Sequence, residues 1–77
     1  GRRLMTKLVT RIHELRKGAN MQQADLAALV GVRRETIGNL ENGKYNPSLK
    51  LAMDIARVFN KPVEEVFCFV EEDDDDE

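Results

Sequence analysis

The chain has 77 residues, 42% of them hydrophobic, which is enough for one small domain. Its single cysteine and single histidine cannot form an internal disulfide or a cysteine-based zinc site, and no apolar run approaches the roughly 18–20 residues of a membrane span. The net charge of −2 hides a basic part, because residues 1–50 carry ten Lys or Arg against four acids and residues 51–77 carry two against ten. A basic body suits a polyanionic partner such as DNA.

The first segment with a regular pattern follows Met5. Residues 1–4 are typical of a cloning remnant, and we leave them out of the expected folded domain, residues 5–70. Leu8, Ile12 and Leu15 are spaced by four and three positions with polar residues between them. This spacing predicts an amphipathic helix that ends at Gly18. No signal-peptide pattern opens the chain, so we expect a cytoplasmic protein.

Two short helices are predicted next, on either side of a glycine. Residues 22–30 place Leu26, Ala27 and Val30 on one face, and residues 33–41 place apolar side chains inward again. Gly31 between them can adopt the positive φ that often ends a helix. So short a connection sets the two helices at a steep angle to each other.

The second half of the chain predicts two more helices and an acidic end. Pro47 favours a helix that starts at Ser48 or Leu49 and runs to Phe59, and Pro62 favours a short helix through Val66. Residues 67–70 alternate weakly and are candidates for extended structure. Residues 71–77 are seven consecutive acids, which repel one another and predict a disordered tail.

The predicted fold is all-α, a five-helix orthogonal bundle with a disordered acidic C-terminal tail. Its expected core consists of the inward apolar positions Leu8, Ile12, Leu15, Leu26, Ala27, Val30, Val32, Ile37, Leu40, Leu49, Ala52, Ile55, Ala56, Phe59, Val63, Val66 and Phe67.

The outer face of the helix over residues 33–41 carries side chains that suit the edges of DNA bases. Arginine can bind guanine through two hydrogen bonds, asparagine can do the same with adenine, and glutamate can accept from cytosine. The residues left on this face after the inward positions are assigned are Arg33, Arg34, Glu35, Thr36 and Asn39. We therefore predict that this helix enters the major groove of double-stranded DNA.

Four segments at matching spacing resemble one known family. They are Gln23-Ala-Asp-Leu-Ala, Gly31-Val-Arg-Arg-Glu-Thr-Ile, Leu40-Glu-Asn-Gly-Lys-Tyr-Asn-Pro-Ser and Ile55-Ala-Arg-Val-Phe. Together they are similar to the Cro/C1-type (Xre-like) helix-turn-helix regulators, and the resemblance covers residues 9 to 67. It implies the lambda-repressor-like DNA-binding fold. We also expect a homodimer, because a domain of this size contacts few base pairs alone, and no cofactor or small-molecule ligand, because the chain has no room for a ligand-sensing domain.

The resemblance also implies roles for individual residues. Gln23 would contact the DNA backbone and brace the recognition helix, and Arg16 would lie near the backbone or form an ion pair with Glu41. The positions that meet base edges are Arg34, Glu35 and Asn39, with Arg33 and Thr36 at backbone or base; Asn42, Gly43 and Lys44 lie in the loop that grips phosphate.

Two positions depart from the family pattern. The family commonly has Ser or Thr at the positions of Gln22 and Arg33, which begin the two helices. Gln and Arg are poor N-caps, so about 0.5–2 kcal/mol per cap is expected to be missing. An arginine at position 33 would be favoured if its side chain contacts a DNA phosphate. The missing cap could also be tolerated without such a contact.

Two segments have more than one interpretation. Residues 67–70 can be a lid over the core or part of a dimer contact, and we favour the dimer contact. The acidic tail can be a solubilising end, a phosphate mimic that competes with DNA, or a binding segment for a basic partner.

The function expected from these observations is that of a sequence-specific regulator, a repressor that binds a short palindromic operator as a homodimer. An antitoxin or a restriction-control protein would have the same fold, and a protein-interaction module could keep the fold without binding DNA. An enzyme is not expected, because the sequence offers no nucleophile–base pair, metal cluster or glycine-rich phosphate loop.

Overall fold

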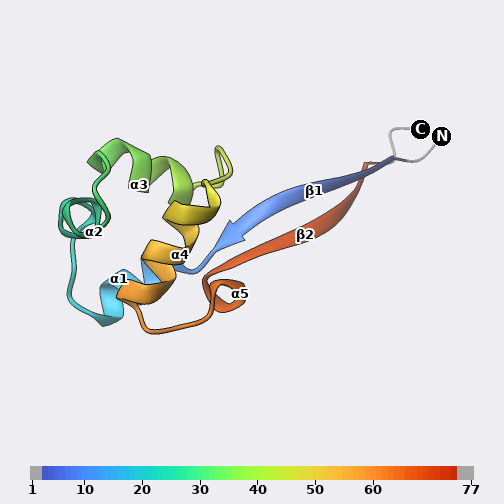
Figure 1. The fold of residues 1–77 in the computed structure, drawn as a ribbon. Helices are drawn as coiled ribbons and strands as arrows, with labels where there is room; N and C mark the ends of the chain where they lie inside the picture. Colours follow the sequence, from blue (N-terminus) through green and yellow to red (C-terminus); the bar gives the residue numbers. More distant parts are fainter. Residues whose placement is uncertain (1–2, 75–77) are drawn as a thin grey trace.

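The computed structural model describes residues 3–74 of the chain. Within them, a strand at each end flanks a group of five helices (Figure 1). The strands are β1 (Arg3–Thr10) and β2 (Phe67–Asp74). The helices are α1 (Ile12–Gly18), α2 (Gln23–Val30), α3 (Arg34–Glu41), α4 (Leu49–Val58) and α5 (Val63–Val66).

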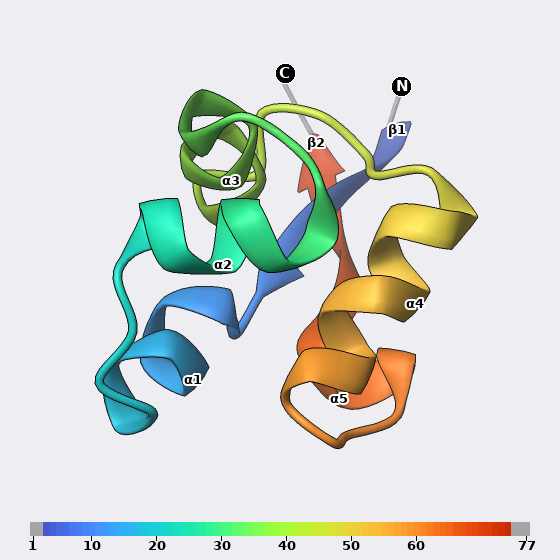
Figure 2. The same cartoon turned by 60° about the vertical axis from the view of Figure 1, so that its left-hand side comes forward.

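The helices form a body whose axes cross steeply, with α3 on one side of the core and α5 on the other (Figure 2). Each helix contributes inward apolar residues at spacings of three and four, which place them on one face. In α4 these residues are Ala52, Ile55 and Ala56, and all three are buried. The largest fully buried side chains of the described part are Ile12, Leu26, Ile37, Leu40, Ile55 and Val66.

The predicted helix ends agree with the structure to within about a residue for α2 to α5. Gly31 ends α2 in the left-handed region, with φ at 75°, and its amide donates to the carbonyl of Ala27. Ser48 begins α4, and its hydroxyl accepts from the amide of Leu51 at 3.1 Å. A hydroxyl acceptor at this position satisfies one of the free amides of the first turn. These local signals are sufficient to set the helices.

The two strands are the main difference from the predicted all-α fold. β1 and β2 pair antiparallel in a two-stranded sheet, which projects from the helical body (Figure 1). Leu8 therefore lies in β1 and pairs with Phe69, and the first helix begins at Ile12. The helix predicted from Leu8 onward was wrong at its start, because a pairing with residues 67–74 decides the backbone there. Residues 67–70 are extended, as expected.

The acidic segment is only partly described. Residues 71–74 complete β2, so the prediction of a disordered tail was wrong for these four positions, where pairing with β1 orders the backbone. Residues 75–77 lie outside the described part. At the other end, Arg3 and Leu4 belong to β1, although we had left residues 1–4 out of the domain.

The expected core is confirmed except at one position. Leu8, predicted as a helix residue, is buried from the strand, and Val63 and Phe59 pack against the buried cluster. Leu49 is 74% exposed because it is the first residue of α4, one turn before the buried face begins. None of the helices in residues 3–74 has the length and apolar character of a membrane-crossing segment.

Candidate nucleic-acid interface

Helices α2 and α3 pack against each other through a small set of buried apolar side chains. Leu26 and Ala27 of α2 are buried, as are Ile37 and Leu40 of α3. Gly31 turns the chain between the helices, and the amide of Val32 donates to the carbonyl oxygen of Ala27 in α2 at 3.0 Å. The result is a rigid pair in which one face of α3 is fixed inward and the opposite face is open (Figure 1).

The open face of α3 carries the predicted base-reading side chains. Arg34, Glu35 and Asn39 are exposed, and Thr36 is half-buried. Arg33 is exposed at the position before the first helical residue. The structure therefore brings these five residues together on one surface, while Ile37 and Leu40 from the same helix are fully buried.

Gln23, at the first position of α2, joins the two helices through its side chain. Its amide nitrogen donates to a carboxylate oxygen of Glu41 at 3.1 Å. Its amide oxygen accepts from the guanidinium of Arg34 at 3.2 Å. One side chain thus contacts residues at both ends of α3.

Arg16 and Glu41 form a buried ion pair that connects α1 to α3. Their side chains are 6% and 7% exposed, and the guanidinium donates to both carboxylate oxygens, at 2.7 and 3.2 Å. Arg16 also donates to the main-chain oxygen of Met21 at 2.9 Å, and His13 lies 3.5 Å from the carboxylate. A two-point contact of this kind fixes direction as well as distance.

The surroundings of Glu41 favour its charged form. Burial alone would raise the pKa of this carboxyl group. The hydrogen bonds from Arg16 and Gln23, together with the positive charge of Arg16, outweigh burial and hold the pKa of Glu41 below its ordinary value. Glu41 is therefore a carboxylate at neutral pH, fully able to hold Gln23.

The two helix starts that lack Ser or Thr differ in how they are satisfied. At α2, the carboxylate of Asp25 accepts from the main-chain amide of Gln22 at 2.9 Å. At α3, the side chain of Arg33 makes no capping hydrogen bond. The sequence analysis missed the contribution of Asp25, although an acid three residues after a helix start is a known capping signal.

The loop after α3 packs directly against β1. The amide of Lys44 donates to the carbonyl of Asn39 at 2.9 Å, which holds the loop on the helix. Gly43 has φ at 68°, and a Cβ atom there would lie 2.7 Å from the carbonyl oxygen of Leu8. This position therefore requires glycine. Asn42 and Lys44, the predicted phosphate-binding residues, are both exposed beside it.

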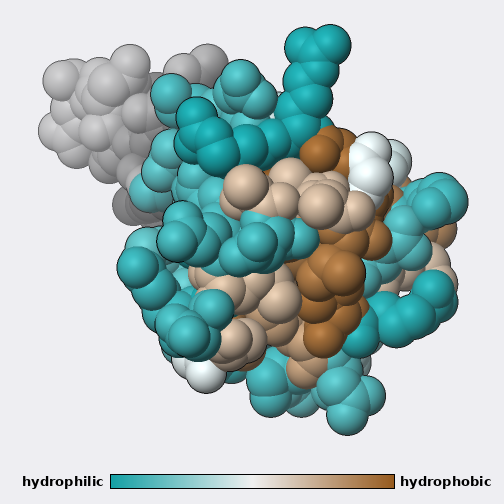
Figure 3. Space-filling view, turned by 90° about the vertical axis from the view of Figure 1, so that its left-hand side faces the viewer, coloured by the Kyte–Doolittle hydropathy of each residue, from teal (hydrophilic) through white to brown (hydrophobic). Residues whose placement is uncertain are grey.

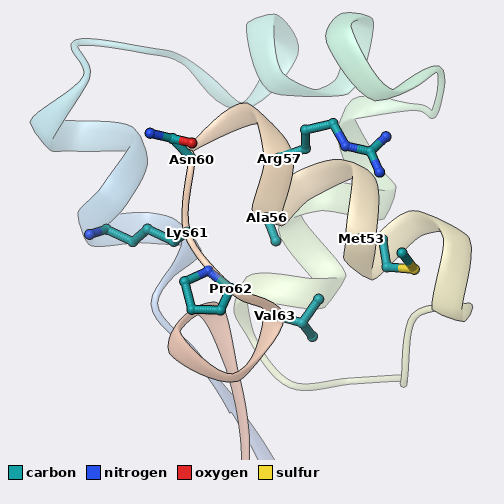
Figure 4. Close-up of a pocket in the computed structure, with 7 residues that line it drawn as sticks. All are labelled: Met53, Ala56, Arg57, Asn60, Lys61, Pro62 and Val63. Atoms are coloured by element: carbon teal, nitrogen blue, oxygen red, sulfur yellow. The ribbon is translucent and has the colours of Figure 1, made fainter.

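Several other hollows lie on the surface of the described residues. The one between α4 and α5 is lined by Arg57 and Lys61, whose side chains point away from each other (Figure 4). Among the described residues, no group of three or more His, Cys, Asp or Glu side chains is placed to hold a metal ion. The side of the body away from the hairpin shows apolar side chains among polar ones (Figure 3).

Comparisons with known proteins agree with this geometry. The helix-turn-helix family model matches residues 12–66, which include all five helices. An uncharacterized HTH-type transcriptional regulator of Archaeoglobus fulgidus is 64% identical over 64 residues, which are 83% of this chain and 90% of that protein. This similarity includes the elements that form the candidate interface.

Solved structures show the same arrangement. The restriction-modification controller protein C.AhdI from Aeromonas hydrophila matches with a TM-score of 0.66 and 33% identity, over 71% of this chain and 83% of its own. The transcriptional regulator VanUg matches with a TM-score of 0.71 over 87% of this chain and 89% of its own, and at 20% identity it shares the fold alone.

Proposed function

The chain belongs to the Cro/C1-type helix-turn-helix family of transcriptional regulators, and on this premise we propose that it is a repressor that binds a short palindromic operator as a homodimer. The proposed mechanism is occlusion of a promoter by the bound protein, without any chemical reaction. The observation that carries the proposal is the open face of α3, where Arg34 is exposed and held by Gln23 while the opposite face is fully buried.

In this proposal, the residues of the α3 face have different tasks. Arg34, Glu35 and Asn39 read base edges in the major groove, because their side chains offer the required donors and acceptors. Thr36 lies beside them and contacts base or backbone. Arg33 meets a phosphate, which would offset the cost of placing a cation at the positive end of the helix.

A second group of residues positions the protein on the duplex. Asn42 and Lys44 contact phosphates from the loop after α3, and Gln23 does so from the start of α2. Phosphate contacts set register and orientation without carrying sequence information. Their contribution to affinity falls as salt concentration rises, because binding releases condensed counterions.

A homodimer would let two α3 helices read two half-sites one helical turn apart. The hairpin supplies candidate contact residues, since Phe69 is 57% and Val70 39% exposed although both are apolar. Phe67, which we had grouped with them, is buried in the core of its own chain. A sheet of two strands is only marginally stable alone, so contact with a second copy would also stabilise the hairpin.

Selection of bound sites from a random DNA pool tests the proposal. We expect one palindromic sequence with half-sites about one helical turn apart. Arg34→Ala should then weaken binding to that sequence by about 1–3 kcal/mol and relax the preference at one base position. Lys44→Ala should weaken binding to all sequences alike.

Two results would contradict the proposal. One is the absence of any selected sequence, which would favour a protein-interaction module without DNA binding. The other is an Arg34→Ala variant that binds selected and random DNA as the parent does, which would refute the role of α3. Lys61→Ala, at the α4–α5 hollow, is the matched control and should leave binding unchanged.

A restriction-control protein is the second candidate, favoured by the 33% identity to the controller protein C.AhdI. It uses the same interface, so the two candidates differ in the genes regulated. Mapping the bound sites in the source genome separates them, because a restriction-control protein should bind upstream of a restriction–modification operon.

A further inference from the structure

We propose that strand β1 is part of the DNA interface, where Thr6 and Lys7 together with Lys44 and Asn46 form a binding site for backbone phosphate of the duplex. The inference rests on the proposed function, because it adds a phosphate contact to the same interface. It extends that interface from the helix-turn-helix unit onto the hairpin, an element that the sequence analysis did not predict.

The site is a hollow between the hairpin and the loop after α3. It measures about 440 Å³, and its polar lining residues are Thr6 and Lys7 from β1 and Lys44, Tyr45 and Asn46 from the loop. The two segments are in direct contact, since a Cβ on Gly43 would lie 2.7 Å from the carbonyl oxygen of Leu8. The loop and the strand therefore lie close enough to contact the same ligand.

The chemistry of the hollow suits an anion. The side chains of its polar lining residues carry two ammonium groups, two hydroxyls and one amide, and none of the lining residues within the described part of the chain is an acid. Lys7, Lys44 and Asn46 are exposed, so their donors can reach a ligand without desolvating the interior. Lysine binds phosphate as a mobile point charge, which suits the irregular path of a DNA backbone.

The orientation of the hairpin favours DNA over a free anion as the occupant. Figure 1 shows β1 on the edge of the hairpin nearer to α3, and α3 packs against β1. Figure 2 shows the hairpin rising from the core toward the same side as the loop after α3. A duplex that lies on the open face of α3 would therefore continue over this hollow.

The acids of the hairpin lie on its other strand. Glu71 pairs with Thr6 in the register, and β2 lies on the edge farther from α3 (Figure 1). Glu71 is therefore the cross-strand neighbour of Thr6, on the strand that does not line the hollow with a charged residue.

Lys7→Gln in the full chain tests the inference, with the selected operator and a random duplex as ligands. Loss of one phosphate contact per protomer, two in the proposed dimer, should lower the slope of log K against log salt by about 1.8, which corresponds to about thirtyfold weaker binding at 0.15 M salt. Both duplexes should be affected alike. Lys7→Arg should restore the parent slope, and the melting temperature should stay unchanged because the side chain is exposed.

Lys44→Gln and Lys61→Gln are the reference variants. A parent-like slope in Lys7→Gln beside a reduced slope in Lys44→Gln would overturn the β1 site and leave the proposed function intact. An equal decrease of the salt slope in Lys61→Gln would also overturn the β1 site, because the loss of any positive charge would then explain the weaker binding. If Lys7→Gln, Lys44→Gln and Arg34→Ala all bind as the parent does, the proposed function fails as well.

Discussion

Replacing Glu41 by alanine should lower the free energy of unfolding by about 3–5 kcal/mol, the usual cost of leaving one member of a buried ion pair without its partner. The partner would be the guanidinium of Arg16, whose side chain is 6% exposed and would keep only its contacts to Met21 and His13. A domain of this length has roughly 4–12 kcal/mol of stability in total. Glu41→Ala should therefore lose at least about a quarter of that stability and unfold at a lower urea concentration than the parent.

The assay is urea denaturation followed by circular dichroism, with Glu14→Ala as the control. Glu14 also pairs with an arginine, Arg11, at 3.3 Å, but the two side chains are 64% and 51% exposed. Exposed pairs of this kind contribute about 0–1 kcal/mol. If Glu41→Ala costs no more than Glu14→Ala, the argument that burial makes the Arg16 pair important is wrong.

The pH dependence of a second variant, Glu41→Gln, follows from the lowered pKa of Glu41. A carboxyl whose pKa is lower in the folded state than in the unfolded state stabilises the protein above its unfolded pKa, which is about 4.3. This stabilisation is lost as the pH falls through the lower folded value. The difference in stability between the parent and Glu41→Gln should accordingly be constant above about pH 5 and shrink below it. A difference that grows on acidification would contradict the ion-pair assignment.

Two further comparisons concern packing, and both are read from urea denaturation. Gly38→Ala should raise the free energy of unfolding by up to about 1 kcal/mol, since the added Cβ meets only side-chain atoms at 3.8 Å. Gly43→Ala should lower the free energy of unfolding, because Gly43 has a positive φ and its added Cβ would lie 2.7 Å from the Leu8 oxygen. The opposite order would refute the loop geometry. Ile55→Ala should cost about 2–5 kcal/mol and Leu49→Ala less than about 0.5 kcal/mol, because Ile55 is fully buried and Leu49 is 74% exposed. Equal losses of stability in the two variants would mean that α4 turns a different face toward the core.

The helices could be predicted from the sequence because their signals are local. Gly31 and Pro62 mark helix ends through backbone restrictions that act within one or two residues. The face of α4 follows from the spacing of Ala52, Ile55 and Ala56. Each of these signals lies within a single turn or loop, so no tertiary contact is needed to interpret it.

The hairpin could not be predicted because its signal is distant. Leu8 stands four residues before Ile12, a spacing that suits a helix, but its backbone pairs with Phe69. Residues 71–74 are acidic and would be solvated as an isolated segment, yet β1 supplies their hydrogen-bond partners. Such pairing depends on the fold as a whole, and the propensity of each segment alone points elsewhere.

In the candidate interface, too, some features could be predicted from the sequence and others depend on the tertiary structure. The α3 residues could be predicted because their residue types suit the edges of DNA bases. The pairing of Arg16 with Glu41 was predicted from the resemblance to the family. The bridge from Gln23 to Arg34 depends on the angle between α2 and α3, which fixes a distance of 3.2 Å. The contact of Gly43 with β1 required the strand itself to be known.

The pairing of β1 with β2 also encloses the helical body within a single chain loop. Val9 and Cys68 are partners in the strand register, so every helix lies on the chain between them. Closing so long a loop costs conformational entropy, and these two strands should therefore associate late in folding, after the helices have formed local contacts. A Val9→Cys variant, oxidised to a disulfide with Cys68, would convert this late association into a covalent ring. On chain-entropy grounds the ring would stabilise the fold by about 4 kcal/mol, and hydrogen exchange at the strand amides would then slow to the rate of the core.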